Sequence, residues 1–378
     1  MATTHVFIVD TTTFKYHLEY MFAGTGAKEH KIDFNNKKSS SLNPQTENNL
    51  VGMIADSQRV RTGDYAIFYL QQNFREGIRE GKFYGVFKVK EAPSFLDNND
   101  NKQFLKSSLG KSLTFRTIIE PHQVYPEGVT EWEALDEIKY IHSPNQMLWS
   151  LIYRKLKGNR GNTMITIYES ERLINLIRNK NNRKSIKGQS YTFNKITQKI
   201  EVSTKFFSYN GRKEIINILP RLIEKYCTKK QFEVHLQAYI LQNLEKLPMF
   251  LNQTIEWIGN EVSCGVGMQR IDIMLSINDQ NRKVVPIELK SVEAYPEIVT
   301  QLQRYVDWIE QYYLPNRPSD IEPMIISREI KDKTTQNYKE LIKAFKTFNS
   351  KNSILPLRYI EFSIDCNKQK ILFKEIKY

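Results

Sequence analysis

The residues best suited to chemistry are two acids and a lysine on neighbouring predicted strands. Asp272 lies in the stretch RIDIMLSI, and Glu288 and Lys290 lie in VVPIELK. Because side chains alternate between the two faces of a strand, Asp272 points away from the isoleucines that flank it. For the same reason, Glu288 and Lys290 share the face opposite the apolar residues of their strand.

The polar turn NDQN, at 278–281, separates the two stretches and predicts a hairpin. In a hairpin, Asp272, Glu288 and Lys290 converge on one side of the sheet. Carboxylate oxygens are the ligands that Mg²⁺ prefers, and a lysine can stabilise the charge on a phosphate. The three side chains therefore suit metal-assisted phosphodiester hydrolysis, and the alternative for such a set is an exposed face where Asp, Glu and Lys meet solvent.

Three further polar residues lie on predicted helices around this pair of strands. Gln301 and Tyr305 are spaced i, i+4 on the helix that follows Lys290, so they share a face. Glu233 lies at the edge of the apolar stripe of an upstream helix. We expect it to reach the same site, with Glu293 and Glu297 as competing acids.

Four segments together resemble the PD-(D/E)xK nuclease superfamily, especially the C-terminal domain of archaeal mismatch endonucleases and the RecB-like nucleases. They are GVG at 265–267, RIDI at 270–273, IELK at 287–290 and QLQRY at 301–305. The resemblance covers about 230–330. One departure is the insertion of Met268 and Gln269 between the glycines and RID.

This resemblance implies a role for each residue of the set. Asp272 and Glu288 would bind Mg²⁺, which Mn²⁺ can replace, and Lys290 would be the catalytic lysine. Glu233 would be the helix-borne acid near the metal. Gln301 and Tyr305 would support the site and touch DNA.

Charge and composition favour a nucleic-acid partner. The chain has 378 residues and a formal net charge of +13, which is typical of proteins that bind polyanions. No apolar run is long enough to span a membrane, and no signal peptide is expected. The three cysteines are far apart in sequence, which indicates a reducing, cytoplasmic environment and no zinc site.

The N-terminal part, 1–177, is expected to be an α+β domain. Its predicted strands and helices are at 5–10, 60–71, 82–90, 113–121, 144–158 and 168–180. The stretch VRTGDYAIFYL with the later GKFYGVFKV resembles a PUA-like barrel of the EVE and YTH kind. That resemblance implies an aromatic pocket that holds a flipped or modified base.

Candidate DNA-binding residues in this domain are of two kinds. The candidate pocket aromatics are Phe68, Tyr69, Trp149 and Tyr153, which also suit a barrel core. The candidate phosphate contacts are Arg154, Lys155 and Arg160, which also suit a solvated helix end.

The rest of the chain is expected to hold a linker and an α/β domain. Residues 178–213 contain ten Lys or Arg and one acid, with aromatic residues between them, and are interpreted as a basic linker. From 214 to 378, strands and helices alternate, which predicts a mixed sheet flanked by helices. The elements expected there include helices at 214–226, 231–247, 296–313 and 338–348.

The sequence therefore predicts a Mg²⁺-dependent DNA endonuclease of restriction or defence type, whose N-terminal domain recognises a site or a modified base. Because one site cuts one strand, cleavage of double-stranded DNA implies a homodimer. Two alternatives remain open. One is a repair nuclease for mismatched or branched DNA, and the other is a DNA-binding protein without catalysis.

Overall fold

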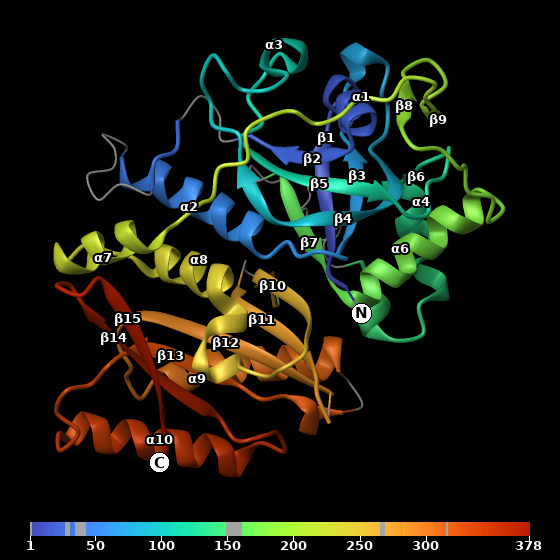
Figure 1. The fold of residues 1–378 in the computed structure, drawn as a ribbon. Coiled ribbons are helices and arrows are strands. Elements are labelled where there is room, and N and C mark those ends of the chain that lie inside the picture. Colours follow the sequence, from blue (N-terminus) through green and yellow to red (C-terminus); the bar gives the residue numbers. More distant parts are fainter. Residues whose placement is uncertain are drawn as a thin grey trace. The chain divides into compact units, whose positions relative to one another are not determined.

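The computed structural model describes residues 2–26, 31–34, 43–148, 161–264, 269–280, 282–314 and 317–378. The chain divides into two compact units. The first unit is built mainly from residues up to Ile216, and the second mainly from Asn217 to Tyr378. Each unit contains its own sheet and its own helices, so the fold is α+β (Figure 1).

The first unit contains a seven-stranded sheet that curls into a half-barrel. The strand order is β2-β5-β4-β3-β1-β7, and β6 pairs with β4. Breaks in register along β4 allow this long strand to bend as it pairs with both β3 and β5. The strands are β1 (Thr4–Val9), β2 (Phe22–Thr25), β3 (Tyr65–Leu70), β4 (Lys82–Leu96), β5 (Phe115–Pro121), β6 (Val129–Thr130) and β7 (Asn162–Ile165).

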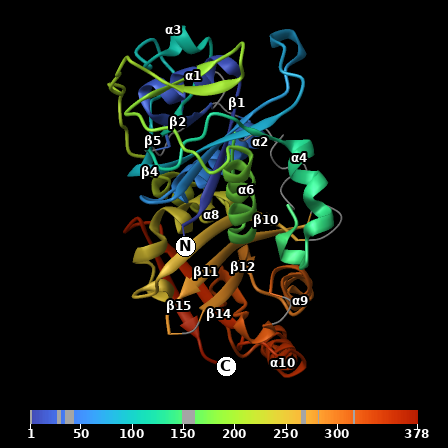
Figure 2. The same ribbon diagram turned by 90° about the vertical axis from the view of Figure 1, so that its right-hand side faces the viewer.

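Helices cover both faces of this sheet. Phe14 and Leu18 of α1 belong to the hydrophobic cluster on one face, and Leu173 and Ile177 of α6 belong to the cluster on the other. Figure 2 shows α6 beside the sheet. The helices are α1 (Thr11–Tyr20), α2 (Pro44–Gln58), α3 (Lys106–Leu109), α4 (Glu131–Asp136) and α6 (Ile167–Lys180), with 3-10 turns at Phe74–Glu76, Glu137–Tyr140 and Pro144–Gln146.

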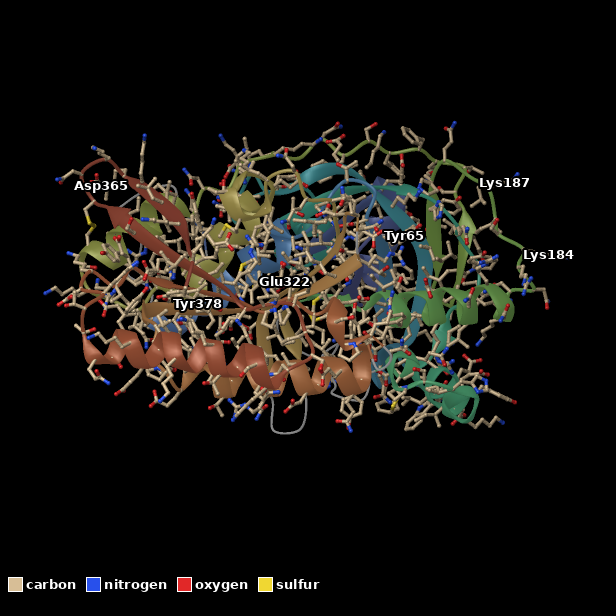
Figure 3. The ribbon with its side chains drawn as sticks, turned by 90° about the horizontal axis from the view of Figure 1, so that it is seen from below. Tyr65, Lys184, Lys187, Glu322, Asp365 and Tyr378 are labelled. Atoms are coloured by element: carbon tan, nitrogen blue, oxygen red, sulfur yellow. A yellow bond between two sulfur atoms is a disulfide. The ribbon has the colours of Figure 1, made fainter. Side chains whose placement is uncertain are left out.

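The segment 178–213 lies within the first unit instead of linking two domains. Its strands β8 (Tyr191–Asn194) and β9 (Lys199–Val202) form a two-stranded ribbon. Tyr191, Phe193 and Ile200 of this ribbon are buried in the same hydrophobic cluster as α1. Basic residues such as Lys184 and Lys187 remain exposed between α6 and the ribbon (Figure 3).

An ion-pair network fixes the end of this segment. The Asp97 carboxylate is buried and lies 3.1 Å from the guanidinium of Arg116 and 3.2 Å from that of Arg212. Arg212 also pairs with Asp100 at 2.8 Å. The basic linker expected over 178–213 is therefore part of the unit, where Arg212 compensates the buried charge of Asp97.

The second unit contains a six-stranded mixed sheet in the order β10-β11-β12-β13-β14-β15. The strands β10, β11 and β12 are antiparallel, β13 and β14 continue parallel to β12, and β15 is antiparallel to β14. This confirms the predicted mixed sheet and hairpin. The strands are β10 (Ile255–Ser263), β11 (Arg270–Asn278), β12 (Arg282–Glu293), β13 (Met324–Arg328), β14 (Arg358–Asp365) and β15 (Lys370–Ile376).

Helices lie against both faces of the second sheet, so its central strands are buried on both sides. Phe232, at the start of α8, packs edge-on against Phe362 of β14. On the other face, Phe345 of α10 packs against Tyr359 of the same strand. The helices are α7 (Leu219–Cys227), α8 (Glu233–Asn243), α9 (Ile298–Trp308) and α10 (Gln336–Lys351), with 3-10 turns at Leu244–Lys246, Pro248–Phe250 and Pro318–Asp320 and a π-helical turn at Ile309–Tyr313.

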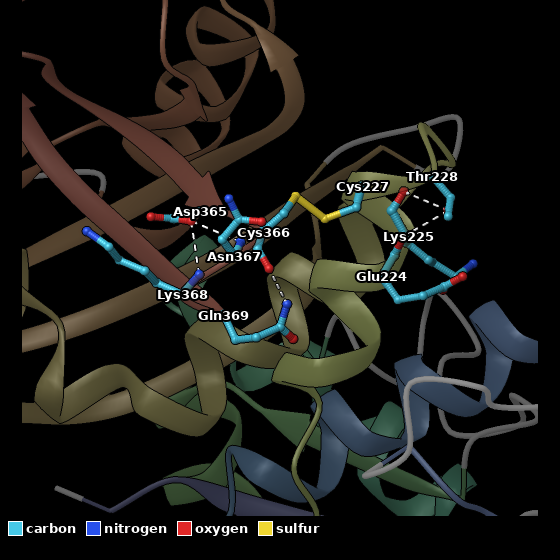
Figure 4. The surroundings of a disulfide bond; sticks show 9 residues. All are labelled: Glu224, Lys225, Cys227, Thr228, Asp365, Cys366, Asn367, Lys368 and Gln369. Atoms are coloured by element: carbon cyan, nitrogen blue, oxygen red, sulfur yellow. Dashed lines mark hydrogen bonds between the residues drawn. A yellow bond between two sulfur atoms is a disulfide. The ribbon is translucent and has the colours of Figure 1, made fainter.

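Three expectations differ from the structure or lie outside it. The helix predicted over 214–226 begins only at Leu219, because Pro220 suits the first turn of a helix. Most of the helix predicted over 144–158 lies outside the described residues. Cys227 and Cys366, expected to be unpaired, form a disulfide that ties α7 to the turn between β14 and β15 (Figure 4).

Candidate active site in the second unit

The strands β10, β11 and β12 place three acids side by side. Ile273 pairs with Ile287, and continuing this register by one residue sets Asp272 opposite Glu288. On the other side of β11, Asn260 pairs with Ile273, which sets Glu261 opposite Asp272. Like charges directly opposite each other destabilise a sheet, so this row of acids is unfavourable for folding alone.

Hydrogen bonds fix the two central carboxylates. The backbone N–H of Leu289 donates to Asp272 Oδ2 at 2.8 Å. The ammonium of Lys290 donates to Glu288 Oε1, and the hydroxyl of Tyr305 lies 2.7 Å from Glu288 Oε2. The Glu288 side chain is fully buried. The orientation of both carboxylates is therefore set by the fold.

Burial and mutual repulsion raise the pKa of both carboxyls. Burial raises the pKa of Asp272 well above its usual range, and the charge of Glu288 raises it further. Burial also raises the pKa of Glu288, although Lys290 partly offsets this. Ionisation of both carboxyls at once is therefore unfavourable in this buried site.

Lys290 remains charged despite its partial burial. Burial lowers the pKa of its ammonium, but the charge of Glu288 and the hydrogen bond to it have the larger combined effect. Glu233 and Asp272 act in the same direction, so the net shift is upward. The lysine is thus a fixed cation beside two acids, and at ordinary pH it stays protonated and does not act as a base.

The predicted pair on α9 lies at this site. Gln301 Nε2 donates to the hydroxyl of Tyr305 at 2.8 Å. The same hydroxyl lies 2.8 Å from the carbonyl oxygen of Arg270 and 2.7 Å from Glu288 Oε2. Tyr305 is buried. Gln301 and Tyr305 therefore position Glu288 from one side.

Glu233 is the helix-borne acid of the site. As the first residue of α8, it accepts a hydrogen bond from the backbone N–H of Ser291 at 3.0 Å. Its charge acts on Asp272, Glu288 and Lys290. Of the competing acids, Glu293 and Glu297 are exposed, and Glu293 lies 4.0 Å from Arg328.

Two residues of the site escaped the sequence analysis. Gln237 follows Glu233 by one helical turn and donates to the carbonyl oxygen of Asp272 at 2.8 Å. Its amide also lies 3.4 Å from Glu261, which pairs with Arg270 at 3.1 Å. The i, i+4 spacing of Glu233 and Gln237 is a signal that could have revealed Gln237.

The candidate base pocket of the first unit is not formed by the residues that the structure describes. Phe68 and Tyr69 are adjacent on β3, so they point to opposite faces and are buried in different hydrophobic clusters. The Tyr69 hydroxyl donates to Glu131. Trp149, Tyr153, Arg154, Lys155 and Arg160 lie outside the described residues, as do the glycines at 265–267.

The donor chemistry of the second unit fits a hard divalent cation, although the described residues form no larger ligand cluster. Within the described ranges, no three His, Cys, Asp or Glu side chains group closely enough to hold a metal ion. Asp272 and Glu288 nevertheless offer carboxylate oxygens, the ligands that a hard divalent cation prefers, and burial of both carboxyls raises their pKa values.

Comparisons with known proteins provide no assignment. No protein-family model matches the chain, and no curated protein matches its sequence. In the part of the chain that is described, no helix is long and apolar enough to cross a membrane. Function is therefore inferred from the geometry of the site.

Proposed function

We propose that the second unit is a Mg²⁺-dependent DNA endonuclease of the PD-(D/E)xK type. The observation that carries this proposal is the convergence of Asp272, Glu288 and Lys290 on one face, with Tyr305 and Glu233 against them. A buried acid pair that repels itself is costly for stability, and such perturbed groups concentrate at functional sites.

Each residue has a distinct role in this proposal. Asp272 and Glu288 would hold Mg²⁺, which would polarise the phosphate and lower the pKa of a water bound to it. Lys290 would place positive charge beside the phosphate oxygens as negative charge builds up on them. Tyr305 and the N–H of Leu289 keep the two carboxylates in position.

The first unit is proposed to bind the DNA substrate as a PUA-like module. Its exposed basic residues between α6 and β8, together with the net charge of +13, support contact with phosphates. A reader of a site or a modified base joined to a nuclease suits restriction of foreign DNA. Cleavage of both strands would then take two copies of the chain.

A cleavage assay tests this function. Wild type and Asp272→Ala are incubated with unmodified, cytosine-modified, adenine-modified, mismatched and branched duplexes, with Mg²⁺ and with EDTA. We expect the wild type to cut only with Mg²⁺ and the rate of Asp272→Ala to fall by about a hundredfold to a thousandfold, as when one main electrostatic group is removed.

The pattern of substrates separates the alternatives. Preference for a modified or specific duplex supports restriction, whereas preference for mismatched or branched DNA supports repair. Absence of cleavage on every substrate, with DNA binding retained, would leave only a binding protein and refute the nuclease.

A further inference from the structure

Two tight turns of the first unit present apolar side chains to solvent. The first is the turn between β3 and β4, where Asn73 and Ile78 exchange backbone hydrogen bonds of 2.9 Å. The four residues between them close the turn, with Gly77 at a φ of 75°. Phe74, within this turn, is 74% exposed.

The second turn connects β8 and β9. The Asn194 side chain accepts hydrogen bonds from the backbone N–H groups of Ile196 at 3.0 Å and Thr197 at 3.2 Å. Ile196 is 94% exposed. These hydrogen bonds order the turn, so the exposure of the isoleucine is a feature of a fixed conformation.

Gln198 joins the two turns. Its carbonyl oxygen accepts from the Tyr84 hydroxyl at 2.8 Å, and its side-chain oxygen accepts from Lys82 Nζ at 2.8 Å. Its side-chain nitrogen lies 3.4 Å from the carbonyl oxygen of Gly77. Phe74 and Ile196 therefore belong to one continuous surface, which we call the paired tips, formed by 73–78 and 194–198.

Cations surround the paired tips. Arg75, Arg79 and Lys195 are exposed, and none of them forms an ion pair with another described residue. By contrast, the acid within the first turn, Glu76, accepts a hydrogen bond from Thr11 of α1 at 2.5 Å. The surface thus combines protruding apolar side chains with three cations that form no ion pair with a described residue, beside the two exposed acids Glu76 and Glu80.

We propose that the paired tips bind duplex DNA, with Phe74 and Ile196 inserting as wedges between base steps and Arg75, Arg79 and Lys195 contacting the flanking phosphates. Apolar wedges with flanking cations are a means of binding and kinking a duplex, and the cost of unstacking is offset by the added contacts. The inference rests on the proposed DNA substrate but does not depend on cleavage.

Charge and shape favour DNA over a protein partner for this surface. A protein interface usually has an apolar centre depleted in charge, whereas here three unpaired cations lie within a few residues of two single apolar side chains. The ordered turns also reduce the entropy lost on binding. Rigid, projecting and basic tips suit insertion into a groove lined by phosphates.

Fluorescence of a duplex containing 2-aminopurine measures the unstacking directly. The full-length chain is mixed with this duplex in EDTA, so that binding is observed without cleavage. We expect wild type to raise the fluorescence, and the double variant Phe74→Ala/Ile196→Ala to abolish the rise and to bind at least about tenfold more weakly. Both side chains are exposed, so the melting temperature of the variant should match that of wild type.

Two further variants sharpen the test. Phe206→Ala removes a phenylalanine that is 64% exposed but follows the opposite end of the ribbon, and it should behave as wild type. Arg75→Ala/Arg79→Ala/Lys195→Ala should lower the slope of log affinity against log salt by about 2 to 3, since each phosphate contact contributes about 0.9.

The proposal is overturned if the Phe74→Ala/Ile196→Ala variant keeps wild-type affinity and fluorescence, or if only RNA duplexes bind. Asp272→Ala separates this inference from the proposed function. If wild type never cuts but both wild type and Asp272→Ala unstack the duplex, the nuclease fails while the paired tips stand.

Discussion

Replacement of Tyr305 by phenylalanine removes one hydroxyl from the centre of the candidate site. The aromatic ring stays in place, so no large cavity forms. The lost group lies 2.7 Å from Glu288 Oε2, 2.8 Å from the carbonyl oxygen of Arg270 and 2.8 Å from Gln301 Nε2. The substitution therefore tests how far the carboxylate depends on this support.

The size of the effect follows from these contacts. A hydrogen bond to a charged group contributes about 1.5–3 kcal/mol, and the Glu288 side chain is fully buried, so water does not replace the hydroxyl readily. We expect Tyr305→Phe to lower the free energy of unfolding of the second unit by about 2 kcal/mol. For a unit of this size, the melting temperature should fall by about 4–8 °C.

Thermal unfolding followed by circular dichroism measures this change. Tyr239→Phe is the matched control, because the Tyr239 ring stacks on Phe373 and its hydroxyl has no hydrogen bond to a described residue. The control should stay within about 0.5 kcal/mol of wild type. If Tyr305→Phe melts as the control does, the hydroxyl does not support Glu288 and the reasoning is refuted.

Three further changes test other parts of the account. Asp272→Asn without metal should raise the free energy of unfolding at neutral pH by about 0.5–2 kcal/mol. Burial raises the folded-state pKa of Asp272, so the free energy of unfolding of wild type should fall as pH rises above 4. Denaturant titrations at several pH values should show a shallower fall for Asp272→Asn. Arg212→Ala should destabilise the first unit by about 2 kcal/mol, because buried Asp97 loses a partner, and it should speed tryptic cleavage within 199–213. The neighbouring Lys213→Ala removes an exposed ion pair with Glu91 and should change neither the stability nor the cleavage rate. Cys227→Ser should lower the stability of the second unit by about 2–4 kcal/mol in non-reducing buffer, and an equal loss on reduction of wild type would identify the bond to Cys366 as the cause.

Local patterns predicted the central part of the second unit. The alternation in RIDIMLSI and VVPIELK gave the pairing of β11 with β12, and the i, i+4 spacing placed Gln301 and Tyr305 together. Such features depend on residues that are close in sequence. Glu261 was missed because its approach to Asp272 depends on the pairing of β10, which was not predicted.

Long-range packing explains why the first unit was predicted less well. The basic and aromatic residues of 178–213 indicated a linker between domains, but Tyr191 and Phe193 are core residues of the first unit. Arg212 meets Asp97 across 115 positions of sequence, and no local pattern reports such a pair. The split of Phe68 and Tyr69 between two faces, in contrast, follows directly from strand geometry.

The most direct test of the proposed active site compares two buried glutamates on the same sheet. Both glutamates contact a lysine and a tyrosine: Glu288 contacts Lys290 and Tyr305, and Glu361 contacts Lys333 at 2.7 Å and Tyr359 at 3.1 Å. The two differ in that Glu288 also faces a second acid, Asp272. Single-turnover cleavage of DNA with Mg²⁺ is measured for Glu288→Gln and Glu361→Gln. Our account predicts loss of cleavage in Glu288→Gln and retention within a few-fold in Glu361→Gln, whereas wild-type cleavage by Glu288→Gln would contradict it.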